Sequence, residues 1–359
     1  MKSKMCVFAL VLLLAFTAMS WAGGRGEAAV DEKPTVAFMS NGPYEFWVYA
    51  AAGVEQAAEE FGVNAEFFMP PGGLPEEQQR FIEAMVARDV AGIAISVTDP
   101  ENLAPFLNEI IEMGVPIVTH DSDAPASNRL AFVGMSNYAA GRTAGRTIRE
   151  ALPDGGNFIV SVGRLDAQNA IERRQGIIDE LNGEPDAFFY PGTMTPDRPD
   201  IALGGGKWTL IDTIVDAGDP IRAKSNAEDA ILRHRERLDL MIGLWSYSTP
   251  AIISAAQDAG VMDEFIIVAF DQEEEVLQGI KDGYVYASMA QDPFMYGYKS
   301  VEILAKIAHG QDPGIPDDKF VDVPAPVITR ENIDEVWDMF RQQLAEGRQF
   351  LDELGIDQP

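Results

Sequence analysis

The feature that most constrains the fold is an order of elements that occurs twice in the 359-residue sequence. Each copy predicts a buried strand, a polar turn, a helix that ends at glycine, a second strand and an aspartate. The turn is Thr98–Pro100 before Asp121 in the first copy and Ser248–Pro250 before Asp271 in the second. From proline to aspartate the interval is 21 residues in both copies. Strands that alternate with helices indicate parallel sheets, so the duplication predicts two similar α/β domains.

The segment Thr35–Gly62 shows how such a unit begins. The apolar run Val36–Met39 predicts a short buried strand, and apolar residues at helical spacing then predict a helix that ends at glycine. The loop between them carries Tyr44, Phe46 and Trp47. Ligands of open parallel sheets bind beyond the carboxyl ends of strands. These rings therefore either contact a ligand with a flat apolar face or only cover the helix start.

The hydrophobic period predicts further helices and strands in alternation. The helices are expected at Pro75–Arg88, Asn102–Met113, Tyr138–Ala151, Ala170–Leu181, Ala223–Arg235, Pro250–Ala259, Glu273–Asp282 and Pro293–His309. The strands are expected at Val90–Val97, Pro116–His120, Asn128–Met135, Asn157–Val162, Leu238–Leu244, Phe265–Phe270 and Tyr284–Met289, with a short strand at Phe188 and Phe189.

Two segments fall outside this alternation. Pro191–Thr209 is rich in proline and glycine and is longer than α/β connections usually need, so it is predicted to be a loop. Trp208 in this loop is expected at the surface or on a lid. Asn332–Leu354 has apolar residues at helical spacing and predicts an amphipathic helix beyond the duplicated units. We expect this helix to pack on its own chain rather than on a partner.

The N-terminus has the pattern of an export signal. The apolar run Met5–Ala18 follows a basic start and precedes the small-x-small sequence Ser20–Ala22. This predicts a signal peptide over residues 1–22, cleaved near Ala22, and a leader over 23–33. The one cysteine, Cys6, would leave with the signal peptide. No disulfide and no thiol chemistry are therefore expected in the exported protein.

Composition and motifs narrow the classes of function. The formal net charge of −30 argues against nucleic acid or an anionic membrane surface as a partner. The sequence has no Gly-x-Gly-x-x-Gly after its first strand, no Gly-x-Ser-x-Gly and no histidine pair at metal-ligand spacing. We therefore expect no cofactor and no metal, and we expect the protein not to be an enzyme.

Six segments, taken together and in order, resemble the type I periplasmic sugar-binding proteins of the ribose-binding kind, the receptors of bacterial ABC sugar importers. They are VAFMSNGPYEFW, GVPIVTHDSD, AIERRQGIIDEL, GLWSYSTPAIISAAQDAG, IIVAFDQ and ASMAQDPFMYG, and they span most of the chain from Pro34 to about Pro316. The resemblance implies two doubly wound parallel-sheet domains joined by a three-segment hinge. The crossovers are expected near Asn137, Gln291 and Asp322.

The resemblance also implies a division of the chain and a role. The N-terminal lobe would comprise 34–136 and 292–321, the C-terminal lobe 137–291 and 322–331, and the helical extension 332–359. A monosaccharide would bind in the cleft between the lobes. The protein would be a periplasmic monomer that delivers the sugar to the membrane permease of an ABC importer.

Carried over position by position, the ligand contacts fall on both lobes. They are Ser40, Tyr44, Phe46, Trp47, Asp121, Ser122, Arg173, Trp245, Asp271 and Gln291. Sugar hydroxyls suit carboxylate acceptors and guanidinium donors, and aromatic rings stack on the C–H face of a sugar. The ribose-binding pattern has arginine at position 122 and asparagine at 44 and 245. The more aromatic residues found here put ribose itself in doubt.

Several alternatives remain open on the sequence. Asp121 and Asp271 could be helix N-caps, which aspartate favours. One of Arg173 and Arg174 is expected to be only a solvated charge, and Gln291 could be a hinge hydrogen-bonding residue. A carbohydrate-active enzyme that uses the two aspartates as an acid/base pair is the main alternative function. A receptor that serves a chemotaxis or sensor protein is another.

Overall fold

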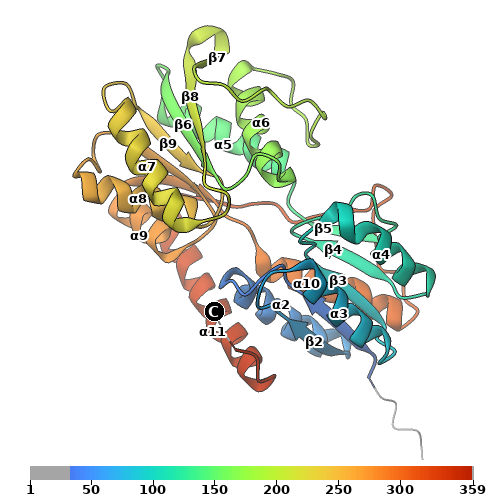
Figure 1. The fold of residues 1–359 in the computed structure, drawn as a ribbon. Helices are drawn as coiled ribbons and strands as arrows, with labels where there is room; N and C mark the ends of the chain where they lie inside the picture. Colours follow the sequence, from blue (N-terminus) through green and yellow to red (C-terminus); the bar gives the residue numbers. More distant parts are fainter. Residues whose placement is uncertain (1–32, 358–359) are drawn as a thin grey trace, which may run out of the picture. The chain divides into compact units, whose positions relative to one another are not determined.

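The computed structural model describes residues 33–357, and from Pro34 onward the chain forms one compact unit (Figure 1). The predicted signal peptide, its cleavage site and nearly all of the leader lie outside the described residues. Within residues 33–357, no helix combines the length and the apolar character needed to cross a bilayer.

Strands and helices alternate along the described chain. The first series is β1 (Thr35–Met39), α2 (Phe46–Phe61), β2 (Asn64–Phe68), α3 (Pro75–Val86), β3 (Gly92–Ile95), α4 (Pro100–Glu112), β4 (Ile117–His120) and β5 (Ala131–Gly134). The second is α5 (Asn137–Ala151), β6 (Gly156–Val162), α6 (Gln168–Asn182), β7 (Ile201–Leu203), η1 (Gly204–Gly206), β8 (Trp208–Val215), α7 (Pro220–His234), β9 (Leu240–Gly243), α8 (Ser248–Ala259), β10 (Ile266–Phe270), α9 (Glu274–Asp282) and β11 (Val285–Met289). The remainder is α10 (Pro293–Ala308), β12 (Phe320–Asp322), β13 (Val327–Ile328) and α11 (Ile333–Glu353).

The described strands form two sheets. One has six strands in the order β12-β5-β4-β3-β1-β2, and the other has seven in the order β13-β11-β10-β9-β6-β8-β7. Pairing is parallel except where β13 meets β11 and β7 meets β8, in the seven-stranded sheet. The central strands are fully buried, because helices cover both faces of such sheets. The predicted fold class, α/β with two mostly parallel sheets, is confirmed.

The described chain passes between the two sheets three times. The passages lie between β5 and β6, between β11 and β12, and between β12 and β13. Asn137, Gln291 and Asp322 lie in or at the edge of these passages. The boundaries of two separately moving lobes stay a prediction.

Two glycines set the close approach of α2 and α10. A Cβ at Gly53 would lie 1.9 Å from the carbonyl oxygen of Phe294, and a Cβ at Gly297 would lie 2.2 Å from that of Ala50. A larger residue at either position would push the helices apart. Because α2 starts directly after the loop that follows β1, this contact fixes the position of that loop.

The segment predicted to be a loop, Pro191–Thr209, is partly regular structure. It contains β7 and leads into β8. The sequence analysis missed both of these strands, and it also missed β2. Its glycines turn the chain between β7 and β8, with positive φ at Gly204, Gly205 and Gly206. Trp208 is 6% exposed, and its indole nitrogen donates to the carbonyl oxygen of Leu152 at 3.2 Å. The prediction of a surface or lid tryptophan was therefore wrong.

The short strand predicted at Phe188 and Phe189 is absent from the described chain. Both side chains are substantially exposed, at 40% and 54%. Their rings contact each other and the ring of Phe320 in edge-to-face arrangements. Aromatic residues favour strands chiefly by packing on a half-buried sheet surface. Here they pack on one another at the surface instead.

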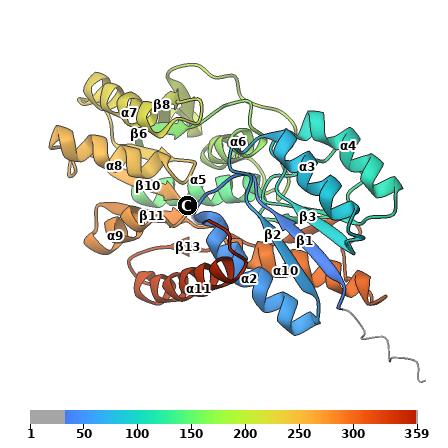
Figure 2. The same cartoon turned by 60° about the horizontal axis from the view of Figure 1, so that its bottom comes forward.

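The predicted C-terminal amphipathic helix is α11, and it packs on its own chain. A Cβ at Gly347 would lie 1.9 Å from the carbonyl oxygen of Val48 in α2, and the ring of Phe340 meets Tyr49 edge-on at 5.7 Å. Leu351 is fully buried. Figure 2 shows α11 running beside α2.

Candidate functional site

Asp121 and Asp271 occupy equivalent places at the ends of β4 and β10. Both have left-handed backbone conformations, with φ of 56° and 69°, which aspartate tolerates better than most side chains. Neither caps a helix: α9 begins after Glu273, and β5 is the next element after Asp121. The alternative that these aspartates are helix N-caps was wrong.

The Asp121 carboxylate is held from within the six-stranded half. Its Oδ2 accepts hydrogen bonds from the Ser96 hydroxyl at 2.9 Å and from the Asn41 side-chain amide at 3.4 Å. Burial raises the pKa of Asp121 to about 6, the Ser96 bond and the Arg173 charge oppose this rise, and the Asp271 charge adds to it. The protein therefore holds this carboxyl in a place where its charge is costly.

The Asp271 carboxylate is held from the passage between β11 and α10. Its Oδ1 accepts from the Gln291 amide at 2.7 Å, and the Tyr296 hydroxyl donates to the Gln291 carbonyl oxygen at 3.2 Å. Asp271 is 4% exposed. Burial raises its pKa, and the Arg173 charge opposes the rise. Gln291 thus orients the Asp271 carboxylate. Its hinge role and its contact with ligand both stay predictions.

Arg173 is the cation that acts on both aspartates. It is 2% exposed, and it donates to the Asn137 side chain at 2.9 Å and to the Leu244 carbonyl oxygen at 2.5 Å. The guanidinium also lies 4.7 Å from the ring centroid of Phe270. Its charge opposes the rise in pKa of both Asp121 and Asp271. The structure therefore brings together three charged groups that are distant in sequence.

The neighbouring Arg174 is not the solvated charge that we expected of one of the pair. It is 1% exposed and donates to the Thr213 hydroxyl, to the Thr195 carbonyl oxygen and to Asp197. These bonds hold the segment before β7 against α6. Both arginines are buried, each with its own set of acceptors, because a buried guanidinium needs several acceptors to offset its desolvation.

The predicted aromatic contacts differ in exposure. Trp47 is 1% exposed, packs on Phe38 and His120, and donates to Asn41 at 3.0 Å. Tyr44 is 59% exposed, and Phe46 meets the Trp47 ring edge-on. Trp47 therefore belongs to the packed interior as the structure stands, and its ring supports Phe46.

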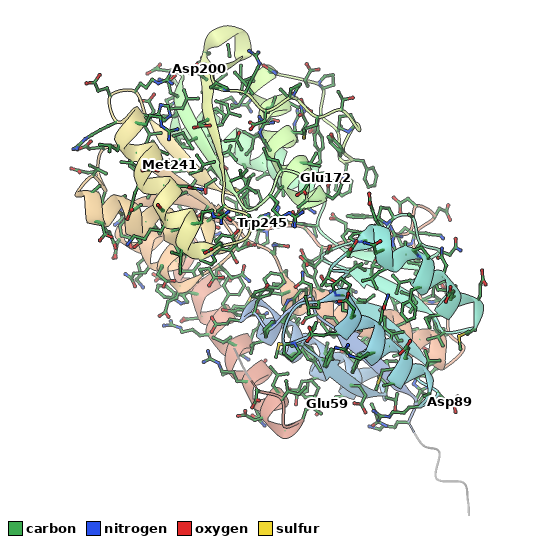
Figure 3. All side chains as sticks on the ribbon, in the orientation of Figure 1. Glu59, Asp89, Glu172, Asp200, Met241 and Trp245 are labelled. Atoms are coloured by element: carbon green, nitrogen blue, oxygen red, sulfur yellow. The ribbon has the colours of Figure 1, made fainter. Side chains whose placement is uncertain are left out.

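Trp245 is half-buried and lies where the seven-stranded half faces the six-stranded half (Figure 3). Its ring covers Gly163, where a Cβ would lie 1.9 Å from the indole. Its indole nitrogen has no hydrogen-bond partner among the described residues. This nitrogen is itself buried, so the donor would reach a ligand only after a local rearrangement.

The two predicted serines use their hydroxyl groups locally. Ser40 is fully buried and donates to the Gly42 carbonyl oxygen, and Ser122 donates to that of Val97, both at 2.8 Å. These bonds shape the loops that follow β1 and β4. The sequence analysis missed Asn41 and Asn137, which bond Asp121 and Arg173. Their positions, directly after Ser40 and at the start of α5, were the available signal.

His120 is a histidine of the packed interior. It is fully buried and stacks on Phe38 with ring centroids 4.1 Å apart. Burial lowers its pKa to about 3, so the ring is neutral. Within residues 33–357, no group of three or more histidine, cysteine or acidic side chains is placed to hold a metal ion.

Comparisons with known proteins identify relatives of the chain. A family model described as a periplasmic binding protein domain matches residues 36–312. The D-ribose/D-allose-binding protein of Pseudomonas aeruginosa is 22% identical and aligns over 84% of this chain and 91% of its own length. The ribose import binding protein of Salmonella typhimurium is 22% identical over 84% of this chain and 93% of its own.

Solved structures share the fold. An ABC transporter solute binding protein from Burkholderia graminis, in complex with D-arabinose, has a TM-score of 0.72 at 26% identity, over 84% of this chain and 97% of that one. A glucose-galactose binding protein from Geobacillus stearothermophilus has a TM-score of 0.71 at 23% identity, over 84% and 99%. The chain therefore belongs to the family of periplasmic binding protein domains.

Proposed function

We propose that the protein is an exported solute receptor that binds a monosaccharide and delivers it to an ABC sugar importer. The observation that carries the proposal is the convergence of Asp121, Asp271 and Arg173. The two carboxylates end equivalent strands of different sheets, and one buried guanidinium acts electrostatically on both. Ligands of such sheets bind outside the carboxyl ends of the strands.

This set of groups suits a sugar. A carboxylate accepts two hydroxyl protons at once, and hydrogen bonds to charged groups are stronger than neutral ones. The indole nitrogen of Trp245 supplies a further donor, and Tyr44 and Phe46 supply apolar ring surface for the C–H face of a sugar ring. The relatives and neighbours that are named for D-ribose, D-allose and D-arabinose support the substrate class.

The location, oligomeric state and membrane partner that we propose are those expected of a sugar receptor. We expect a periplasmic protein, released from its signal peptide near Ala22, that acts as a monomer and docks on a membrane permease. We expect no chemical change in the sugar. The enzyme alternative would use Asp121 as a general acid or base, since its pKa of about 6 suits proton transfer near neutral pH.

A thermal-shift screen of the purified protein with pentoses, hexoses, deoxysugars and inositols tests the proposal. A ligand that binds only the folded state stabilises it by about 2.7 kcal/mol at a hundredfold excess over Kd. At least one sugar of this panel should raise the melting temperature, and chromatography should recover it unchanged. A converted sugar would favour the enzyme, and no response to any member would contradict the receptor.

A further inference from the structure

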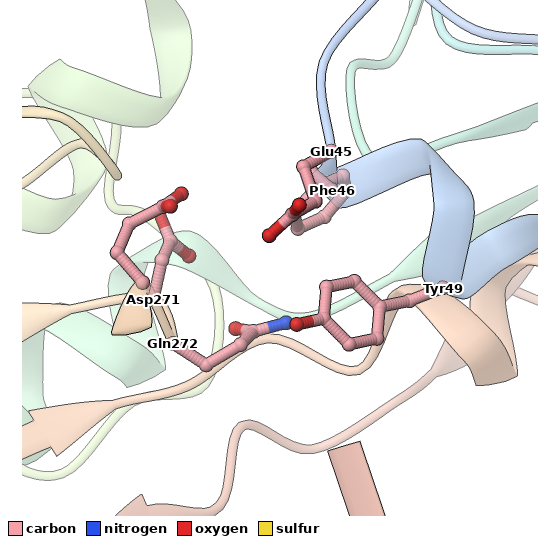
Figure 4. A pocket seen from close by; sticks show the side chains of 6 residues that line it. Glu45, Phe46, Tyr49, Asp271 and Gln272 are labelled. Carbon is pink, nitrogen blue, oxygen red and sulfur yellow. The ribbon is translucent and has the colours of Figure 1, made fainter. Parts of the chain in front are cut away.

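A small cavity lies beside Asp271 and is not used by the contacts described above. It is lined by Glu45, Phe46, Tyr49, Asp271, Gln272 and Glu273, and its volume is about 10 Å³. This is room for about one group of the size of a water molecule. Figure 4 shows Glu45 and Tyr49 at the start of α2 on one side and Asp271 and Gln272 on the other.

The lining combines three carboxylates with a buried amide that lacks partners. Gln272 is 5% exposed, and neither atom of its side-chain amide has a hydrogen-bond partner among the described residues. A buried amide without partners is costly and indicates a missing polar group. Burial, followed by the charges of Asp271 and Glu45, raises the pKa of Glu273 to about 7, and a hydrogen bond from Ser246 opposes the rise.

Two of the three carboxylates at the cavity are opposed by a cation. Arg348 donates to Glu45 at 2.9 Å at the exposed rim, and the charge of Arg173 acts on Asp271. Glu273 is the N-cap residue of α9, but its side chain makes no capping bond to that helix. The cavity therefore has three carboxylates against two cations, one of which also acts on Asp121.

We propose that this cavity receives a protonated amino group of the ligand, so that the preferred substrates are amino sugars. The inference rests on the proposed function, because the amino group must be carried by a sugar bound between Asp121 and Asp271. An ammonium group has three donors and no acceptor. Asp271, Glu273 and the carbonyl oxygen of Gln272 supply three matching acceptors, whereas a hydroxyl group supplies one proton and no charge.

Titration calorimetry with matched pairs tests the inference on the purified protein. The pairs are glucosamine with glucose, galactosamine with galactose and mannosamine with mannose, at a pH at which the amines are protonated. The amino member of the best-bound pair should bind at least about tenfold tighter, because charge-assisted bonds are about twice as strong as neutral ones. Equal binding, or tighter binding of the neutral member, would overturn the inference and leave the proposed function standing.

Two variants locate the effect. Glu273→Gln keeps the shape of the side chain and removes its charge, so it should reduce the preference for the amino member about tenfold. Asp282→Asn removes a charge from an exposed position at the far end of the same helix and should leave the preference unchanged. Melting curves check that both variants fold. An unchanged preference in Glu273→Gln would overturn the inference, and failure of every sugar to bind would overturn the proposed function with it.

Discussion

At the scale of single residues, the left-handed backbone of Asp271 determines which substitution is informative. Asparagine is among the few residues that accept this conformation, so Asp271→Asn changes the charge and keeps the backbone. Losing a hydrogen bond to a charged group costs about 1.5–3 kcal/mol. Sugar affinity should therefore fall at least about tenfold in calorimetry. Asp263→Asn, at an exposed position, is the matched control, and equal affinity in both variants would remove Asp271 from the site.

The pKa of Asp121 predicts a pH dependence of stability. The folded protein holds this proton up to a pH of about 6, whereas the usual value of the group is 3.8. Between these values the folded state binds more protons than the unfolded state, so the free energy of unfolding falls as the pH rises. The slope due to this one group is at most about 1.4 kcal/mol per pH unit.

Urea unfolding of the ligand-free protein at several pH values from about 4 to 7 measures this effect. Asp121→Asn keeps the left-handed backbone and removes the titrating group. As the pH rises over this range, the variant should therefore lose less stability than the wild type. A variant with the same pH profile as the wild type would show that the carboxyl titrates normally in the folded protein.

At the scale of elements, α11 is held by a contact that leaves no room for a side chain. Gly347→Ala would place a Cβ 1.9 Å from the Val48 carbonyl oxygen and force α11 away from α2. Overpacking of this kind costs about 1–3 kcal/mol. Chemical unfolding should show this loss, whereas Glu346→Ala at the exposed neighbouring position should change stability by only a few tenths. Equal stability of the two variants would show that α11 packs loosely.

At the scale of the whole molecule, we predict that sugar binding closes two lobes by hinge bending at the three passages between the sheets. Small-angle scattering should give a smaller radius of gyration with saturating sugar than without it. α11 packs against both sheet regions. Ile333 and Phe340 belong to the hydrophobic cluster that includes residues of β9 and β10, and Leu351 belongs to the cluster that includes residues of β1. Closure must therefore carry α11 along or repack it. An unchanged radius would count against closure.

Tryptophan fluorescence separates the two rings named as ligand contacts. Trp47 is already 1% exposed, whereas Trp245 is half-buried and its indole nitrogen has no partner among the described residues. Trp245→Phe should therefore abolish most of the fluorescence change on sugar binding. Trp47→Phe should keep it, if the variant remains folded by its melting curve. The reverse pattern would show that Trp47 leaves the interior when ligand binds.

The sequence by itself determined the alternating elements and the matched positions of Asp121 and Asp271. Apolar runs, glycine helix ends and the 21-residue interval are local signals. Such signals can be recognised without knowing which distant residues they contact. The same signals placed α11 correctly as an amphipathic helix. These signals did not identify β8, because a strand that directly follows a glycine-rich stretch looks like part of the loop in the sequence.

Only the tertiary structure decided how the side chains near the site are used. Trp47 joined the interior because Phe38 and His120 come to lie against it. Arg174 was buried because Thr213 and Asp197 reach it from other segments. The acidic cavity beside Asp271 exists because the start of α2 meets the loop before α9. Each of these outcomes depends on partners far away in sequence, and burial and charge balance are properties of the assembled set of neighbours rather than of any residue alone.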